Sequence, residues 1–494
     1  MAKVAAVILA DNGPDAERQA RKALSKGADL VELRLDQLRR PDSAVFRKLA
    51  AAVGSRSIAT LRSPEQGGAS ASSLIPRDAL LKEMCGLPFA FVDIELSADG
   101  ERAKELSGLA KRNRTTLVAS HHFAEPADLA KVGDAFEACS AIGDVAKVAV
   151  PVADFGSATQ LVDLGRAQAK RSRRTIVIGT GPAGMLTRAL ADDTGQEIQY
   201  AAWGHAASPG QLALATAKRL RGRDPIVLGI VGHPLGHSLS PAIQEAALDA
   251  LDLAGVYLPF DLDSKSLDAF LDASDRLRIR GFNVTIPHKE AIVEKLDELD
   301  GDAERLGAVN TVVLRDGWSN GYNTDVFGFR LSLRSLGLRV GGRRSLVVGA
   351  GGAAKAVVQV LLRENAKVEV ANRTVLRAEA LADAFDESVQ VVPMDSLGRS
   401  GPWDLLVNAT PVGTKGFPND LPVPDSVVQK AGFVYDLVYN PPMTPLLAAA
   451  KRLGRPGASG LEMLLNQAAK SFELWTGRSP PVVAMRRAAK EALR

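Results

Sequence analysis

A lysine stands inside an apolar run in the first half of the chain. Lys147 lies within Val145–Val150 and has apolar neighbours on both sides, so its side chain points either into a protein interior or at solvent between helices. Burying an ammonium group is costly, and a lysine placed in this way tends to be partly neutral and nucleophilic. Residue type and setting therefore make Lys147 a candidate nucleophile.

Other charged side chains stand at the ends of neighbouring apolar runs. Taken singly, each is explained better by a solvated position at the rim of a sheet than by a catalytic role. Successive residues of a strand face opposite sides, so only one of His121 and His122 can enter an interior. The full set of such residues is Glu32, Arg34, Arg62, Asp93, Glu95, His121, His122 and Arg188.

A glycine-rich turn in the second half indicates a dinucleotide site. The segment Gly349–Lys355 follows the predicted strand Ser345–Val348 and opens a helix. Glycines permit a tight turn and a close backbone approach, and the helix N-terminus can meet a pyrophosphate. The candidate cofactor-binding residues of this turn are Gly349, Ala350, Gly351, Gly352 and Ala353.

The next predicted strand, Lys367–Ala371, bears on the choice of cofactor. An NAD site would place Asp or Glu near its end to hold the ribose hydroxyls. This chain instead has Asn372, Arg373 and Thr374, with Arg377 beyond them. Two guanidinium groups favour a 2′-phosphate, so we predict NADP.

Four polar motifs precede the glycine-rich turn. A serine before a proline caps a helix and an Asn-Thr pair forms a turn, so each motif alone has an ordinary structural explanation. His288 is interpreted as a solvated loop residue. The motif residues that chemistry could use are Ser238, Ser240, Thr285, Lys289, Asn310 and Asp325.

Predicted strands and helices alternate regularly in the first half of the chain, which carries Lys147 and the charged residues near it. Helix-length amphipathic segments separate eight strand-like runs within residues 1–222, which favours an N-terminal (β/α)8 TIM barrel over a doubly wound sheet. We expect these strands at Lys3–Leu9, Leu30–Asp36, Ser57–Arg62, Phe89–Leu96, Thr116–Phe123, Val145–Val152, Thr175–Thr180 and Ile198–Trp203.

The short polar segment Arg221–Pro225 is interpreted as the joint to a second, two-lobed α/β region. We predict that this region divides near residue 330 into a first lobe at 226–330, completed by C-terminal helices at about 461–494, and a second lobe. A Rossmann-type cofactor domain is expected at 331–460. The fold class is thus α/β throughout.

Composition excludes several classes of protein. The 494 residues include 61 basic and 57 acidic ones, and the two short basic runs are typical of solvated helix ends rather than of a nucleic-acid surface. Two cysteines without Cys/His spacing predict neither a disulfide framework nor a metal site. No apolar run reaches membrane-spanning length and no signal peptide is expected, so we predict a cytoplasmic protein. Oligomeric state is not predicted.

The order of motifs in residues 1–220 resembles the type I 3-dehydroquinate dehydratases, with VELRLD, TLRS, VDIEL, SHH, AKVAV and Ser-Pro-Gly-Gln at one strand apiece. The resemblance implies that Lys147 forms a Schiff base with a substrate ketone and that a histidine moves the proton. It also implies that Arg188 binds the substrate carboxylate. The other implied substrate-binding residues are Glu32, Arg34, Arg62, Ser208 and Gln211.

Three departures from that family concern the histidines and two loops. Alignment on Phe123 makes His121 the general acid/base, whereas alignment on Ser120 selects His122; we expect His121 to enter the barrel. Gln66 stands where many members carry Glu. The loop serine of the family falls at Ala207, beside Ser208.

Residues 226–494 resemble shikimate dehydrogenase, through the four polar motifs, the glycine-rich turn and Gly460–Gln467. The resemblance implies that Lys289 and Asp325 form the catalytic pair. The implied substrate-binding residues are Ser238, Ser240, Thr285, Asn310, Tyr439 and Gln467, and Leu437 and Gly460 join the NADP-binding residues.

The two resemblances together predict one enzyme with two successive activities. Dehydration of 3-dehydroquinate yields 3-dehydroshikimate, the ketone that the second half would reduce to shikimate. A class I aldolase-type barrel is the alternative for the first half, and carbon–carbon cleavage would reveal it. A regulatory protein with a decayed dehydrogenase domain is the alternative for the second, against which both Lys289 and Asp325 are present.

Overall fold

The computed structural model describes residues 1–69, 75–236, 238–385 and 388–493. The chain forms two compact units. The first comprises Met1–Val227, Asp252–Phe260 and Arg276–Arg278, and the second comprises the remaining segments. Among the described residues, no helix is both long and apolar enough to cross a membrane.

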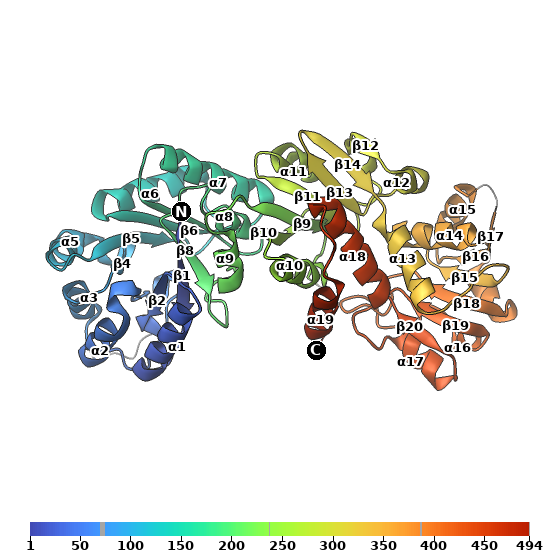
Figure 1. Ribbon diagram of the computed structural model, residues 1–494, viewed down its shortest axis with the longest axis horizontal. Coiled ribbons are helices and arrows are strands. Elements are labelled where there is room, and N and C mark those ends of the chain that lie inside the picture. Colours follow the sequence, from blue (N-terminus) through green and yellow to red (C-terminus); the bar gives the residue numbers. More distant parts are fainter. Residues whose placement is uncertain (70–74, 237, 386–387, 494) are drawn as a thin grey trace. The chain divides into compact units, whose positions relative to one another are not determined.

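Eight parallel strands of the first unit form a barrel in the order β7-β6-β5-β4-β3-β2-β1-β8 (Figure 1). A parallel bridge between Thr175 and Gln196, just before β8, brings the two ends of this order together. The predicted barrel is confirmed. The ends of each expected strand differ from those of the observed strand by at most two residues. The strands are β1 (Lys3–Ile8), β2 (Leu30–Arg34), β3 (Ser57–Thr60), β4 (Phe91–Glu95), β5 (Thr116–His122), β6 (Val145–Pro151), β7 (Thr175–Thr180) and β8 (Ile198–Ala202).

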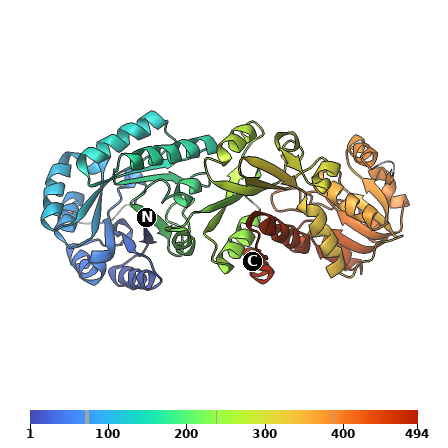
Figure 2. The ribbon, with the colours of Figure 1, turned by 45° about the horizontal axis from the view of Figure 1, so that its top comes forward.

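Helices surround these strands (Figure 2). Several begin at an acidic or amide side chain that accepts a hydrogen bond from a backbone N–H three residues on, as Asn12, Asp42, Asp128 and Asp154 do. The helices of this unit are α1 (Gly13–Ser25), α2 (Ser43–Val53), α3 (Arg77–Gly86), α4 (Leu96–Asp99), α5 (Ala103–Arg112), α6 (Leu129–Ile142), α7 (Phe155–Lys170), α8 (Met185–Ala189) and α9 (Leu214–Leu220). All but the last residue of β10 (Gly255–Asp261) also belong to this unit.

The barrel interior is filled by alternate residues of each strand. Val118 on β5 and Val145 and Ala149 on β6 belong to one buried cluster. Because strand residues alternate between faces, Ser120 and Lys147 must face the same interior. The two are register partners on adjacent strands, which places them side by side.

The second unit contains a mixed sheet in which β9, β11, β13, β14 and β12 follow one another. β13 is antiparallel to β11 and to β14, whereas β12 is parallel to β14. Helix α10 packs against α18 and α19, which come from the end of the chain. The elements are β9 (Ile226–Gly232), α10 (Ser240–Ala250), α11 (Leu267–Ser274), β11 (Ile279–Val284), β12 (Glu298–Leu299), α12 (Gly301–Leu306), β13 (Thr311–Arg315), β14 (Trp318–Tyr322), α18 (Leu461–Thr476) and α19 (Val482–Ala492).

A parallel sheet in the order β17-β16-β15-β18-β19-β20 forms the rest of the second unit, as expected for a Rossmann-type domain. Val347 packs into one buried cluster and its neighbours Leu346 and Val348 into another, so both faces of the sheet are covered. The elements are α13 (Thr324–Ser335), β15 (Arg344–Val348), α14 (Gly352–Arg363), β16 (Lys367–Ala371), α15 (Val375–Asp383), β17 (Val389–Val391), β18 (Trp403–Asn408), α16 (Asp425–Val428), β19 (Ala431–Asp436), α17 (Pro445–Arg452) and β20 (Gly457–Ser459).

Short 3-10 helices complete the described elements. They are η1 (Leu35–Gln37), η2 (Gly54–Arg56), η3 (Pro64–Gln66), η4 (Gly100–Arg102), η5 (Val293–Lys295) and η6 (Met394–Arg399).

Candidate active sites

Lys147 is buried in the middle of β6 and is only 2% exposed in the barrel interior. Its Nζ donates to Asp93 Oδ2 at 2.8 Å and lies 3.9 Å from Glu32 Oε1. Burial raises the pKa of Asp93, but the charges of Lys147 and Arg62 outweigh it, and the pKa of this carboxyl is lowered. The amine is therefore charge-paired, rather than alone among apolar side chains as its own strand indicated.

Arg62 organises the carboxylates beside this lysine. Its guanidinium donates to Glu95 Oε1 at 3.1 Å and to Ser120 Oγ at 3.2 Å, and contacts Asp93 Oδ2 at 3.5 Å. Ser120 in turn donates to Asp93 Oδ1 at 2.6 Å. Asp93, Glu95 and Ser120 thus belong to the site, although sequence reasoning assigned them no role. The signal was present for the two acids, since alternate residues of one strand face the same side.

Glu32 and Arg34 occupy different positions relative to the lysine. Glu32 lies near Lys147 and also accepts from Thr60 Oγ1 at 2.9 Å. Arg34 instead donates to both carboxylate oxygens of Asp36 at 2.8 Å, so its guanidinium is paired before any substrate binds.

Arg188 carries a buried guanidinium with spare hydrogen-bonding capacity. One nitrogen contacts the carbonyl oxygen of Tyr200 at 3.4 Å, while Nε has no partner among the residues the structure describes. Burial lowers the pKa of this guanidinium to about 10, with Glu32 acting in the opposite direction. A buried cation with free donors is suited to binding an anion such as a carboxylate.

Ser208 and Gln211 lie in the loop after β8. Gln211 Oε1 accepts from the backbone N–H of Ala207 at 2.9 Å, and the Gln211 N–H donates to the Ser208 carbonyl. Both of these hydrogen bonds lie within the loop, so a contact of either side chain with substrate stays a prediction.

The two histidines at the end of β5 face opposite ways. Val118 and Ser120 face the interior, so His122 shares their face and His121 does not. Burial and then the charges of Arg62 and Lys147 hold the pKa of His122 well below its usual value. The ring of His121 instead packs edge-on against Phe123, with 4.5 Å between centroids. The structure therefore corrects the expected facing, because His122, not His121, lies on the lysine side of the strand.

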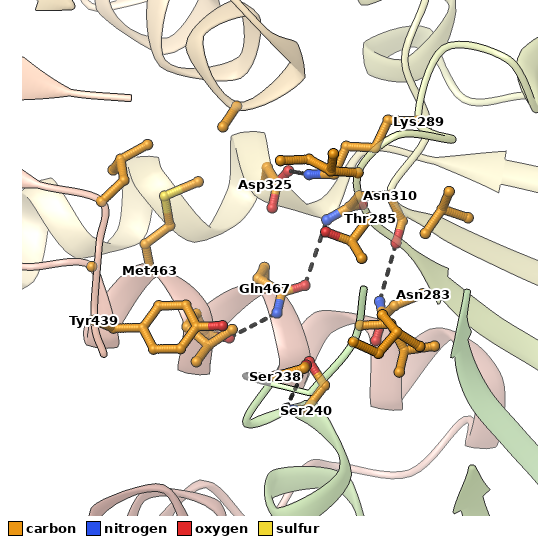
Figure 3. Close-up of a pocket in the computed structure, with 18 of the residues that line it drawn as sticks. Ser238, Ser240, Asn283, Thr285, Lys289, Asn310, Asp325, Tyr439, Met463 and Gln467 are labelled. Carbon is orange, nitrogen blue, oxygen red and sulfur yellow. Dashed lines mark hydrogen bonds and ion pairs between the residues drawn. The ribbon is translucent and has the colours of Figure 1, made fainter. Parts of the chain in front are cut away.

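Lys289 and Asp325 form an ion pair in a pocket of the second unit (Figure 3). Lys289 Nζ lies 2.5 Å from Asp325 Oδ2, and both side chains are largely buried. Lys289 follows β11 and Pro287, and Asp325 lies in the first turn of α13, so the pair joins two elements distant in sequence. The predicted pairing in space is observed.

The same pocket is lined by every substrate-binding residue expected in this half. Figure 3 shows them around one cavity. The Asn310 amide oxygen accepts from the Thr324 N–H at 2.7 Å and its nitrogen contacts Gln467 at 3.5 Å, so these side chains are held in place before any ligand binds. The lining residues among the predictions are Ser238, Ser240, Thr285, Lys289, Asn310, Asp325, Tyr439 and Gln467.

Two residues near this pocket differ from expectation. His288 is fully buried and its Nε2 lies 2.7 Å from the Leu262 carbonyl oxygen, so its interpretation as a solvated loop residue is wrong. Asn283, to which no sequence argument gave a role, lines the pocket and donates to the Asn310 carbonyl at 3.2 Å.

The glycine-rich turn lies against Lys289. A Cβ on Gly352 would come within 3.3 Å of Lys289 Cδ, so the lysine stem fills the space that this glycine leaves. Gly349 has φ +120, and a side chain there would meet the Ala409 backbone at 3.0 Å. The turn therefore accommodates a close ligand on one side and the candidate proton donor on the other.

Leu437 and Gly460 also meet at this pocket. A Cβ on Gly460 would overlap the Leu437 carbonyl oxygen, and the Gly460 N–H donates to the Val438 carbonyl at 3.2 Å. Ala353 lines the pocket as well, whereas Ala350 packs against the core of the domain.

The end of β16 presents free cationic side chains. Arg373, Thr374 and Arg377 are exposed, and Asn372 Nδ2 donates to the Thr374 carbonyl at 2.9 Å. Within the described part of the chain, no ion pair of Arg373 or Arg377 is observed. Two unpaired guanidinium groups beside a dinucleotide turn fit the extra phosphate of NADP.

Comparison with known proteins adds independent findings. Four family models match the chain: type I 3-dehydroquinase over residues 4–222, the shikimate dehydrogenase substrate-binding domain over 230–312, shikimate/quinate 5-dehydrogenase over 331–413, and the C-terminal domain of shikimate 5′-dehydrogenase over 460–490.

Individual relatives resemble the whole chain or its second half. A chloroplastic bifunctional 3-dehydroquinate dehydratase/shikimate dehydrogenase of Arabidopsis thaliana is 31% identical over 508 residues, covering 97% of this chain and 82% of the plant protein. A shikimate dehydrogenase (NADP(+)) of Caldanaerobacter subterraneus subsp. tengcongensis is 44% identical over 256 residues, covering 51% of this chain and 91% of its own. A shikimate 5-dehydrogenase from Thermus thermophilus, solved with NADP(H) and shikimate, is 41% identical with a TM-score of 0.50 and covers 54% of this chain and 100% of its own.

Proposed function

The chain belongs to the bifunctional 3-dehydroquinate dehydratase/shikimate dehydrogenase family, and from that premise we propose how its own residues carry out the two reactions. The enzyme dehydrates 3-dehydroquinate to 3-dehydroshikimate and reduces that ketone to shikimate with NADPH. It is thus both a lyase and an NADP-dependent oxidoreductase of the shikimate pathway.

Dehydration proceeds through Lys147. Its Nζ bonds to the ketone carbon, the ketone oxygen leaves as water, and the protonated imine draws electrons from the adjacent C–H bond. His122 accepts that proton and returns it to the departing hydroxyl group, which leaves as a second water. One water then hydrolyses the product imine, which restores the ketone oxygen, releases 3-dehydroshikimate and frees the Lys147 amine. The observation that supports this assignment is the shared interior face of His122 and Lys147, where burial and then the charges of Arg62 and Lys147 lower the pKa of the histidine.

Substrate is held around this lysine. The guanidinium of Arg188 binds the carboxylate, because it is buried with an unpaired nitrogen. Glu32 and Arg62 orient the ring hydroxyl groups near Lys147. Arg34 acts while paired with Asp36, and Ser208 and Gln211 close the site from the loop after β8.

Reduction takes place in the pocket of the second unit. Bound NADPH supplies the hydride. Lys289 donates the proton to the carbonyl oxygen, and Asp325 holds the lysine in place and orients the hydroxyl group that forms. Ser238, Ser240 and Tyr439 bind the carboxylate, and Thr285, Asn310 and Gln467 bind the ring hydroxyl groups.

These roles assign each activity to a range of residues. We assign the dehydratase to residues 1–222 and the substrate-binding domain of the dehydrogenase to 226–330 together with about 461–494. The NADP-binding domain takes 331–460. A cytoplasmic location is part of the proposal and rests on the free, buried Cys85 and Cys139, which suit a reducing compartment.

The proposed base is tested by replacing each histidine. His122→Ala should lower dehydratase turnover by about two to four orders of magnitude, the usual effect of losing a general acid/base. His121→Ala should cost much less. Formation of 3-dehydroshikimate is followed by its conjugated-enone absorbance and coupled to NADPH consumption. Because the pKa of His122 lies well below 6.5, the base stays neutral at neutral pH, and the rate should fall only at pH below 6.5.

The control for both histidine variants is reduction of supplied 3-dehydroshikimate, which should be unchanged. A larger loss with His121→Ala than with His122→Ala would show that His121 is the base and would contradict the assignment.

Cofactor choice is tested by removing two charges. The double variant Arg373→Ala/Arg377→Ala should raise the KM for NADP about tenfold or more, because charge-assisted contacts with a 2′-phosphate are lost. The KM for NAD should barely change. The matched control, Lys367→Ala/Arg399→Ala, removes two exposed charges from the same domain and should affect neither cofactor. Equal loss for both cofactors would show that Arg373 and Arg377 only support the fold.

A further inference from the structure

The ring of Tyr200 contacts the Lys147 amine, in addition to the Asp93 carboxylate. Tyr200 lies on β8 within the buried interior cluster and is 4% exposed. Lys147 Nζ stands 4.2 Å from the centroid of the tyrosine ring. The amine therefore lies between two groups, the Asp93 carboxylate and the face of an aromatic ring.

The ring, rather than the hydroxyl group, makes this contact. Tyr200 Oη is buried and has no hydrogen-bond partner among the described residues. Burial, followed by the charges of Glu32 and Asp93, raises the pKa of the phenol well above its usual value, so the hydroxyl group stays neutral. The negative face of a neutral aromatic ring attracts a cation, and the attraction is larger where water is excluded.

The nitrogen carries the same positive charge before and after imine formation. The ammonium group first releases one proton, and the neutral amine nitrogen then bonds to the ketone carbon. The ketone oxygen leaves as water, taking one hydrogen from the nitrogen together with the released proton. The product nitrogen keeps one hydrogen and the positive charge. A ring face that attracts the ammonium group therefore also attracts the protonated imine, without rearrangement of the site.

Resting on the proposed role of Lys147, we infer that Tyr200 is a catalytic residue of the dehydratase, whose ring face stabilises the cation at Lys147 Nζ in the protonated imine. The ring also covers that side of the nitrogen, so a water molecule cannot take the same place. Together with Asp93, Tyr200 keeps the imine nitrogen protonated, and the protonated imine is the electron sink on which proton removal depends.

A pair of substitutions separates the ring from its hydroxyl group. Tyr200→Phe keeps the ring and removes an unpaired hydroxyl group, so dehydratase kcat should stay within about twofold of wild type. Tyr200→Leu removes the ring face, and kcat should fall about tenfold. Borohydride trapping during turnover should also yield less adduct on Lys147 in Tyr200→Leu. Equal rates and adduct yields in the two variants would overturn the inference.

A fluorinated series keeps the test valid if Tyr200→Leu fails to fold. Phenylalanine at position 200 is replaced in turn by its mono-, di- and trifluoro forms, which keep the ring's shape while withdrawing electrons from its face. The inference requires dehydratase kcat to fall stepwise with fluorination while reduction of 3-dehydroshikimate stays constant. A flat series would reject it.

The outcome for wild type separates this inference from the proposed function. A borohydride adduct on Lys147 together with a flat fluorination series rejects only the role of Tyr200. Absence of any adduct on Lys147 during wild-type turnover rejects the imine mechanism itself, and the inference with it.

Discussion

Replacing Lys147 with alanine is expected to abolish dehydration of 3-dehydroquinate while reduction of supplied 3-dehydroshikimate continues at the wild-type rate. The imine forms at Lys147 Nζ, the amine that lies beside Asp93 and Glu32, so the loss should reach about four orders of magnitude or more. The reduction site belongs to the other compact unit and does not depend on this lysine.

Borohydride trapping identifies the lysine directly. Adding borohydride with 3-dehydroquinate should leave a stable adduct on the tryptic peptide that contains Lys147, and Lys147→Ala should leave none. Lys3→Ala is the matched control, since Lys3 lies on β1 of the same barrel but pairs with Glu197 at 3.4 Å. An adduct on another lysine would show that the nucleophile has been misassigned.

The barrel could be predicted because its signals are local. Each strand is an apolar run bounded by polar residues, and eight such runs with intervening helices are difficult to accommodate in another fold. The cofactor turn could be predicted for a similar reason, since Gly349–Lys355 is one continuous segment.

The facing of the histidines could not be settled from the sequence. Alternation requires His121 and His122 to face opposite sides, but it does not say which side is inside. That choice depends on the register between β5 and β6, which pairs Ser120 with Lys147 and so turns His122 inward. An alignment anchored on Phe123 rather than on Ser120 therefore gave the opposite result.

The partners of Lys147 were missed for a related reason. Asp93 and Tyr200 lie on other strands, 54 and 53 residues away from the lysine in sequence, and meet it only when the barrel closes. His288 shows the reverse error. The sequence predicts a solvated loop residue, yet its ring is buried against the Leu262 carbonyl group.

The second large effect is expected for the pair formed by Lys289 and Asp325. Lys289→Ala should lower ketone reduction by about two to four orders of magnitude while raising the KM for 3-dehydroshikimate far less. The proton of Lys289 is needed mainly as negative charge develops on the carbonyl oxygen, so its loss raises the barrier more than it weakens binding. Dehydration should continue, and 3-dehydroshikimate should accumulate in the presence of NADPH.

Asp325→Asn tests whether Lys289 needs the charge of its partner, and a surface ion pair serves as the control. Asp325→Asn preserves shape but removes the charge that holds Lys289, so turnover should fall while the protein remains folded. Lys295 and Asp268 form the matched control, since their atoms are also 2.5 Å apart but on an exposed surface. Such pairs contribute about 1 kcal/mol at most, so Lys295→Ala should leave reduction unchanged. If Lys289→Ala or Asp325→Asn behaved like this control in steady-state assays, the pair would be structural, and the proton would have to come from another group lining the pocket.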